Sequence, residues 1–197
     1  MCGRYYLFAD IEEISRRFNI NYCDVLIKSM PEIFPSNEVP IIINNGNKRM
    51  IKLMKWGFDL SYLKKLIINA RSETIDTKKL FKYSFYNKRC LIPASGFFEW
   101  KKENGKSIKY KIYLKDKNLF SMAGIYSSFK NKNGEYVDCF TILTTNANRK
   151  ISSIHNRMPV ILDRDSEQIW LNNSIKDENL KELLKPIDDV KIEISRV

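Results

Sequence analysis

The chain has 197 residues, and its 44% hydrophobic and 12% aromatic content is enough to build a buried core. Its 34 Lys and Arg residues against 23 Asp and Glu residues give a net charge of +11, which favours a polyanionic partner, nucleic acid foremost, over a lysine-rich coding bias. No apolar stretch approaches the ~20 residues that span a bilayer, and no repeat or linker divides the sequence, which excludes a helical membrane protein and favours a single domain over residues 1–197.

The first third of the chain is expected to contain a helix followed by a hairpin. Residues 10–18 are predicted to be helical, because apolar side chains recur on one face and Asp10 is a suitable N-cap. Residues 39–43 and 49–56 have strand-like patterns on either side of an Asn-rich turn at residues 44–47, which is typical of a hairpin.

The rest of the chain is dominated by predicted strands. These are residues 89–93, 107–115, 119–126, 136–145 and 190–195. The strands at 119–126 and 136–145 are expected to pair across a Gly-containing turn, and short helices are expected at residues 165–171 and 177–184. Together these elements favour an α+β fold, a curled or barrel-like and mostly antiparallel sheet with a few flanking helices.

The four cysteines are not grouped along the chain. No pair has zinc-type spacing, and the single histidine, His155, adds too few ligands for a metal site. Cys23, Cys90 and Cys139 lie among apolar neighbours, which indicates reduced core residues. We therefore expect neither a metal nor another cofactor.

Cys2 differs from the others because it directly follows the initiator Met1. Removal of Met1 would leave an α-amine and a thiol on adjacent carbons, a 1,2-aminothiol that condenses with an aldehyde to a Schiff base and then to a thiazolidine. These groups titrate at about 7.7–8.0 and about 8.5, and both are partly available at neutral pH. Taken alone, Cys2 is better explained as a residue without function. Only the rest of the sequence can favour the alternative, that Cys2 is a nucleophile.

Two further side chains are suited to proton transfer. His155 is the single histidine, and a lone histidine is more often structural than catalytic. The polar segment around it favours a position at the surface or in a cleft. Glu99 stands between aromatic residues, where desolvation would raise its pKa, and an ordinary solvent-facing glutamate is an equally good interpretation.

Two blocks have both a structural and a binding interpretation. The polar block at residues 69–74 either caps a helix or presents the Asn69 amide and the Arg71 guanidinium to a site, and arginine is well matched to phosphate. Trp56 and Phe58 flank a glycine, and core packing is the usual explanation of such rings. Exposed rings near basic residues would instead stack on nucleobases.

These blocks together resemble the SOS response-associated peptidase (SRAP) family, whose members process abasic sites in DNA. The resemblance covers essentially the whole chain, and the blocks follow the family's order. They are Met1-Cys2-Gly3-Arg4-Tyr5, Pro35-Ser36-Asn37, Trp56-Gly57-Phe58, Asn69-Ala70-Arg71-Ser72-Glu73-Thr74, residues 89–100, Ala123-Gly124-Ile125-Tyr126, Thr144-Thr145-Asn146-Ala147-Asn148 and residues 155–162.

The resemblance implies a covalent DNA–protein crosslink. Cys2 would attack the ring-opened aldehyde of an abasic site in single-stranded DNA and end as a thiazolidine. Asn69 would orient the Cys2 terminus, and Glu99 and His155 would be the acid–base pair that moves protons during formation and reversal of the adduct.

The resemblance also implies DNA-binding residues. Arg71 and Arg157 would hold the phosphates on either side of the lesion, with Arg4 assisting. Trp56 and Phe58 stand where family members carry a hydrophobic wedge beside the DNA.

The implied activities are those of a protein of the DNA-damage and SOS response. They are autocatalytic removal of Met1, crosslinking to abasic single-stranded DNA and an AP-lyase side reaction. We expect a cytoplasmic monomer, associated with the nucleoid when bound to DNA, without a membrane partner.

Two other functions are compatible with the sequence. One is a non-covalent single-stranded DNA-binding protein that uses the same basic groove. The other is a self-processing protease with peptide substrates and no role on DNA, although the charge of +11 argues against it.

Overall fold

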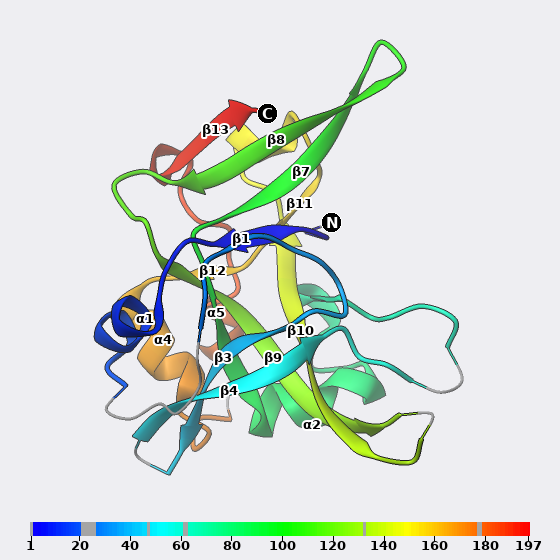
Figure 1. The fold of residues 1–197 in the computed structure, drawn as a ribbon, viewed down its shortest axis with the longest axis vertical. Coiled ribbons are helices and arrows are strands. Elements are labelled where there is room, and N and C mark those ends of the chain that lie inside the picture. The colour runs from blue at the N-terminus through cyan, green and yellow to red at the C-terminus, as the bar shows by residue number, and fades with distance from the viewer. Residues whose placement is uncertain (1, 21–26, 47, 61–62, 132, 177–178) are drawn as a thin grey trace.

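The computed structural model describes residues 2–20, 27–46, 48–60, 63–131, 133–176 and 179–197. In these ranges the chain forms two β-sheets with short helices around them (Figure 1). Most buried apolar side chains of both sheets belong to one continuous core. The fold therefore has a single hydrophobic interior, to which both sheets contribute.

The larger sheet is built around a closed barrel. Its strands are β3 (Glu38–Asn45), β4 (Lys48–Trp56), β6 (Arg89–Ala94), β9 (Phe120–Lys130) and β10 (Tyr136–Asn146). They follow the order β10-β4-β3-β6-β9, and β9 pairs again with β10, which closes the barrel. The β10–β4 pairing is parallel, and the other pairings of the barrel are antiparallel. The expected α+β class with a barrel-like, mostly antiparallel sheet is confirmed.

Three short strands extend the barrel beyond this ring. They are β5 (Asn69–Arg71), β11 (Arg157–Pro159) and β12 (Ile161–Leu162). β5 and β11 both pair with the C-terminal half of β10, where Thr144 lies opposite Arg71 on one side and Pro159 on the other. Two segments that are far apart in the sequence are thereby fixed on either side of one strand.

The smaller sheet has five strands in the order β13-β8-β7-β1-β2. They are β1 (Tyr5–Leu7), β2 (Met30–Ile33), β7 (Gly96–Glu103), β8 (Lys106–Leu114) and β13 (Ile192–Arg196). β7 and β8 form a long hairpin (Figure 1), and β1 pairs with β7 on one side and with β2 on the other. The N-terminal segment is therefore held inside the sheet rather than at its edge.

Short helices pack around the sheets. They are α1 (Ile11–Phe18), η1 (Ser72–Thr74), α2 (Lys79–Asn87), α3 (Arg149–Ser152), α4 (Arg164–Leu171), α5 (Asn179–Glu182) and η2 (Asp189–Lys191). The predicted cap of the first helix is confirmed, because the Asp10 side chain accepts from the Glu13 amide and Glu13 bonds back to Asp10. No helix within the described ranges has both the length and the apolar composition needed to cross a bilayer.

The predicted hairpin is confirmed, with β3 and β4 paired across the Asn-rich turn. Of the predicted helix at 177–184, residues 177–178 lie outside the described ranges, and α5 covers Asn179–Glu182. Cys23 also lies outside these ranges, whereas Cys90 and Cys139 are buried as expected. Helix α2 was not predicted, because its lysines and aromatics give a weak helical pattern and the barrel stabilises it by contact.

Candidate functional site

Cys2 is fully buried just ahead of strand β1. The Asn69 side chain, at the start of β5, donates from Nδ2 to the Cys2 carbonyl at 2.9 Å, and the Cys2 thiol is within 3.9 Å of the Arg4 carbonyl. Burial raises the pKa of the Cys2 thiol, and the nearby Glu99 carboxylate raises it further. The thiol is therefore held in its protonated form in this chain.

Glu99 lies on β7, in the strand next to β1. The Phe98 amide donates to the Arg4 carbonyl at 2.9 Å, which fixes β7 against the residues that follow Cys2. Glu99 is only 3% exposed, and desolvation by burial raises its pKa. This excludes a solvent-facing glutamate, and a carboxyl group of this kind can keep its proton closer to neutral pH.

His155 lies between α3 and β11, and its ring is oriented by the backbone. Its Nδ1 accepts a hydrogen bond from the Arg157 amide at 3.0 Å, and a neutral ring therefore carries its proton on Nε2. Burial lowers the pKa of His155, which favours this neutral form at physiological pH. The imidazole is thus able to accept a second proton.

Arg157 is committed to partners inside the protein. Its Nη1 and Nη2 donate to the two oxygens of the Glu73 carboxylate at 2.5 and 3.0 Å, and further to the Asn146 side chain and the Thr144 carbonyl. The Arg157 side chain is 10% exposed. A direct contact with a flanking phosphate is less well supported for Arg157 than for Arg71, because the Arg157 side chain is nearly buried and both of its terminal nitrogens already donate to protein oxygens.

The other two predicted arginines lie nearer to solvent. Arg71 is exposed at the end of β5, two residues after Asn69. Arg4 donates to the Glu32 carboxylate at 2.9 Å, and its guanidinium lies 3.7 Å from the centre of the Phe34 ring. Arg71 is therefore the better placed of the two for a phosphate beside Asn69.

Trp56 and Phe58 are both fully buried, which agrees with the core-packing interpretation and leaves neither ring exposed to stack on a nucleobase in this structure. Trp56 packs edge-on against Tyr5 at 5.2 Å, and Phe58 packs against Phe129 at 4.8 Å between ring centres. Trp56 Nε1 donates to the carbonyl of Ile68 at 3.0 Å. Trp56 thus supports the segment that carries Asn69 from within the core.

The structure therefore brings together the predicted Cys2, Asn69 and Glu99 around the start of β1. The ion pair between Arg157 and Glu73 joins β11 to η1, and it fixes the turn with His155 beside the polar block at residues 69–74. Sequence reasoning missed the role of Glu73. The available signal was an acidic residue in one polar block and an arginine in another.

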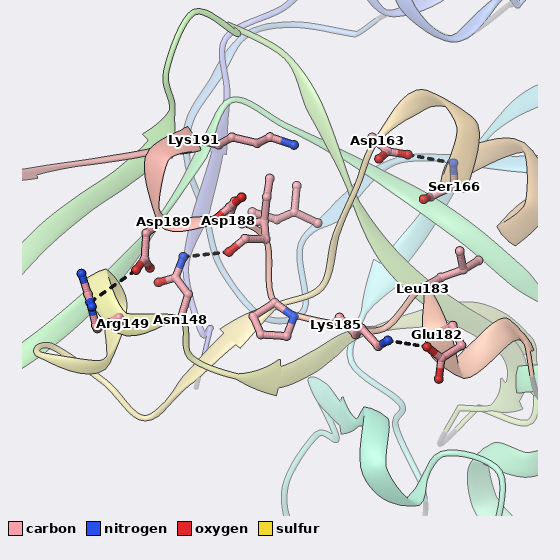
Figure 2. Close-up of a pocket in the computed structure, with 13 residues that line it drawn as sticks. Asn148, Arg149, Asp163, Ser166, Glu182, Leu183, Lys185, Asp188, Asp189 and Lys191 are labelled. Atoms are coloured by element: carbon pink, nitrogen blue, oxygen red, sulfur yellow. Dashed lines mark hydrogen bonds and ion pairs between the residues drawn. The ribbon is translucent and has the colours of Figure 1, made fainter.

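A surface hollow elsewhere is a poor candidate for the site. It lies between α3, α4 and the segment before β13, with a volume of about 500 Å³, and contains none of the predicted residues (Figure 2). Its charges largely pair with one another, for example Lys185 with Glu182 and Arg149 with Asp189 (Figure 2). Within the described ranges, no group of three or more His, Cys, Asp or Glu side chains could hold a metal ion.

Comparison with known proteins gives consistent relatives. Abasic site processing protein YoqW of Bacillus subtilis (strain 168) is 36% identical in an alignment of 212 positions, which covers 100% of this chain and 92% of the relative. Abasic site processing protein YedK of Escherichia coli (strain K12) is 29% identical, over 93% of this chain and 85% of the relative.

A crystal structure of a protein from Bacteroides thetaiotaomicron matches with a TM-score of 0.89 at 29% identity, over 100% of this chain and 92% of that chain. A sequence model described as SOS response associated peptidase (SRAP) matches residues 1–197. With both the fold and the whole sequence in agreement, this chain belongs to the SRAP family.

Proposed function

We propose that this protein processes abasic sites in single-stranded DNA by forming a covalent thiazolidine crosslink through Cys2, after it has removed Met1. The names of its relatives support abasic-site processing as the general activity. The net charge of +11 supports a polyanionic substrate. The proposal rests on one observation above all: Cys2, the second residue of the chain, is held by Asn69 next to a buried Glu99.

The chemistry begins with a free terminus. Hydrolysis of the bond between Met1 and Cys2 frees the Cys2 α-amine, which adds to the aldehyde carbon of the ring-opened sugar. Loss of water gives a Schiff base, and the sulfur then adds to the same carbon while the nitrogen takes up a proton. The product is a five-membered thiazolidine, and the net change is aldehyde plus aminothiol giving thiazolidine plus water.

The two titrating residues have complementary properties for these steps. Glu99, whose pKa is raised, is the proposed proton donor to the oxygen that leaves as water. His155, whose pKa is lowered, is the proposed base that receives the thiol proton. Reversal of the adduct uses the same groups in the opposite direction.

The remaining site residues are proposed to hold the reactants. Asn69 fixes the Cys2 carbonyl, which keeps the α-amine of the trimmed chain in place. Arg71 is the proposed contact for a phosphate beside the lesion, with Arg4 assisting. Arg157 acts indirectly in this proposal, because its ion pair with Glu73 holds the turn that carries His155.

A denaturing gel tests the crosslink. The purified protein is incubated with labelled single-stranded DNA that contains one abasic site, and a band that survives denaturation is expected. Cys2→Ala should lose this band, whereas Cys139→Ala, which removes another buried thiol, should keep it. Binding without any such band would instead support the non-covalent single-stranded DNA-binding protein.

Intact mass tests the processing step. The wild-type protein is expected to lack Met1, and Cys2→Ala is expected to retain it. A protein that forms the crosslink with Met1 still attached would overturn the proposed chemistry, since its α-amine would not be on Cys2.

The denaturing gels also test the proposed AP-lyase side reaction. A shortened labelled DNA strand would reveal it, because a Schiff base permits β-elimination.

A further inference from the structure

The two faces of the five-stranded sheet differ, and the outer face has no place in the chemistry above. Side chains alternate between the faces along each strand. Tyr5, Phe97 and Ile112 on one face belong to the continuous core of the molecule. Tyr6 and Phe98 on the other face are 3% and 7% exposed, but they are not part of this core. Something other than the barrel must cover them.

Cations cover these rings. Lys109 Nζ lies 4.1 Å from the centre of the Phe98 ring, and Lys111 Nζ lies 4.6 Å from that of Tyr6. The register of the β7–β8 hairpin explains the arrangement, because Lys111 is opposite Phe98 and Lys109 is opposite Trp100. The outer face, which we define by Arg4, Tyr6, Phe98, Trp100, Lys109 and Lys111, thus interleaves charges with aromatic rings.

An exposed phenylalanine stands at each end of the outer face. Phe34 is 43% exposed beside Arg4, and Phe8 is 49% exposed beside Tyr6, with 5.0 Å between the centres of the Tyr6 and Phe8 rings. Lys111 Nζ is also 5.6 Å from the centre of the Phe8 ring. Rings that keep a free surface next to held cations offer both stacking and charge.

A hollow of about 430 Å³ opens at the Phe8 end. Its lining includes the aromatic Phe8, Tyr6 and Tyr113, and charged side chains of both signs, Lys111, Lys117, Glu13 and Asp116. The volume falls within the range of small-ligand pockets and is large enough for a nucleobase. Aromatic side chains and the two ammonium groups of Lys111 and Lys117 suit a flat ring attached to a phosphate.

We propose that the outer face binds the single-stranded DNA that continues from the lesion, with a nucleobase in the hollow at Phe8 and phosphates at Lys111 and Lys109. Charge complementarity selects this occupant. The outer face carries three cations, and Glu32 is the carboxylate that bonds to two of them, Arg4 and Lys109. Cations that rings already hold in place lose little further freedom when they bind phosphate.

The outer face is continuous with the candidate site through the backbone. Arg4 is two residues from Cys2, and Trp100 follows Glu99 directly, with the Glu99 and Trp100 side chains on opposite faces of β7. A DNA strand whose abasic sugar lies beside Cys2 reaches Arg4 and Trp100 once it passes the N-terminal end of β1. The inference rests on the proposed function for the identity of the strand, and its test does not require a lesion.

The test compares two double variants with matched chemistry. Phe8→Ala/Lys111→Glu alters the outer face, and Tyr83→Ala/Lys82→Glu removes an exposed ring and reverses a lysine on α2. Affinity for an intact oligothymidylate of about 20 nucleotides, longer than a small binding site, is measured by fluorescence anisotropy over a range of salt concentrations. Crosslinking is measured in parallel with an abasic oligonucleotide of about 5 nucleotides.

The outer-face variant is expected to bind the long strand about tenfold more weakly, and the slope of its salt dependence should fall by about 0.7 logarithmic units for each phosphate that the variant no longer neutralises. Its crosslinking of the short substrate should match that of the wild type. A loss no larger than that of the α2 variant would overturn the proposal, and so would an equal loss on both substrates.

Thermal melting checks that both variants fold. If Phe8→Ala/Lys111→Glu does not fold, Lys111→Gln against Lys82→Gln decides by the same criteria, with a smaller expected loss. Failure of the wild type to crosslink would refute the proposed function, while a selective loss on the intact strand would still support this surface. The two failures are therefore distinguishable.

Discussion

The inner face of the five-stranded sheet places Glu99 against the core, whereas the outer face places Lys109 and Lys111 over aromatic rings. The same strands supply both, and Glu99 and Trp100 are adjacent residues on opposite faces. Burial on the inner face raises the pKa of Glu99. A raised pKa suits a carboxyl group that has to donate a proton. On the outer face, charges stay partly in water, where they remain charged and can meet phosphate.

This difference shows why the reacting and the binding residues are kept apart. A proton donor gains from desolvation, while a phosphate-binding cation is weakened when desolvation lowers its pKa. Alternation along a strand separates the two environments by a single residue. The predictions below test how far each face depends on its own environment.

The largest expected effect is on the inner face. Glu99→Gln should slow crosslink formation about 100-fold, because an amide cannot donate the proton that the leaving oxygen requires. The rate is measured by quenching the reaction with an abasic oligonucleotide at timed intervals. Glu103→Gln, a change on the same strand at its exposed end, should leave the rate unchanged, and equal rates in both variants would remove Glu99 from the mechanism.

The pH dependence of stability provides a control for Glu99→Gln. A raised folded-state pKa means that the folded protein holds this proton more tightly than the unfolded chain does. The wild type should therefore lose stability relative to Glu99→Gln as pH rises from about 4.5 through the folded-state pKa. Melting temperatures of the two proteins at acidic and neutral pH check this, and a difference in melting temperature that does not shift in favour of Glu99→Gln as pH rises would contradict it.

Gly96→Ala should disrupt the packing of Tyr6 on the outer face. An added Cβ would lie 2.3 Å from the Tyr6 hydroxyl oxygen, and the Tyr6 ring is nearly buried and has little room to move. We expect a loss of about 1–3 kcal/mol in the free energy of unfolding, measured by urea denaturation. In a Tyr6→Ala background the same substitution should cost much less, and additive losses would show that the clash is not the cause.

The Glu73–Arg157 pair is a test of charge near the inner face. Glu73→Gln should lower stability by about 1–2 kcal/mol at neutral pH, a value reduced because the Glu73 side chain is 44% exposed. The Arg157 guanidinium lowers the pKa of Glu73, and the contribution of the pair is therefore present above about pH 4.5 and lost as pH falls through the folded-state pKa. The free energies of unfolding are measured at neutral pH and at a pH below about 4.5. Glu38→Gln, a change at another exposed carboxylate, is the control.

The smallest effect is expected at Lys109. Lys109→Met keeps the aliphatic stem over the rings but removes the hydrogen bond to Glu32 at 2.6 Å. Both side chains are more than a quarter exposed, and we expect a loss below about 1 kcal/mol that shrinks further at high salt. Urea denaturation at two salt concentrations, with Lys82→Met as the control, measures this. A loss that does not change with salt would mean that packing, not charge, is what Lys109 supplies.

Local patterns in the sequence predicted many of the elements correctly. The cap at Asp10 and the hairpin of β3 and β4 depend on residues near one another, and both are confirmed. The orientation of Trp56 could not be predicted in this way. Its ring faces the core because β4 pairs with β10, which is more than 80 residues further along the chain.

Cys2, Asn69, Glu99 and His155 were grouped as a candidate site from the sequence only through the family resemblance. The geometry that relates them depends on the long-range pairing of β1 with β7 and of β5 and β11 with β10. The same applies to Arg157, whose partner Glu73 lies 84 residues away in the chain. The sequence does not distinguish an arginine that faces solvent from one that is nearly buried in an ion pair.

The sequence by itself determined the chemical groups that this protein has available: a cysteine next to its first residue, one histidine, and a large excess of positive charge. Only the tertiary structure decided which groups are desolvated and which meet water. The physical reason is that burial is a property of packing between distant segments. A side chain acquires its protonation state and its accessible surface only when those segments come together.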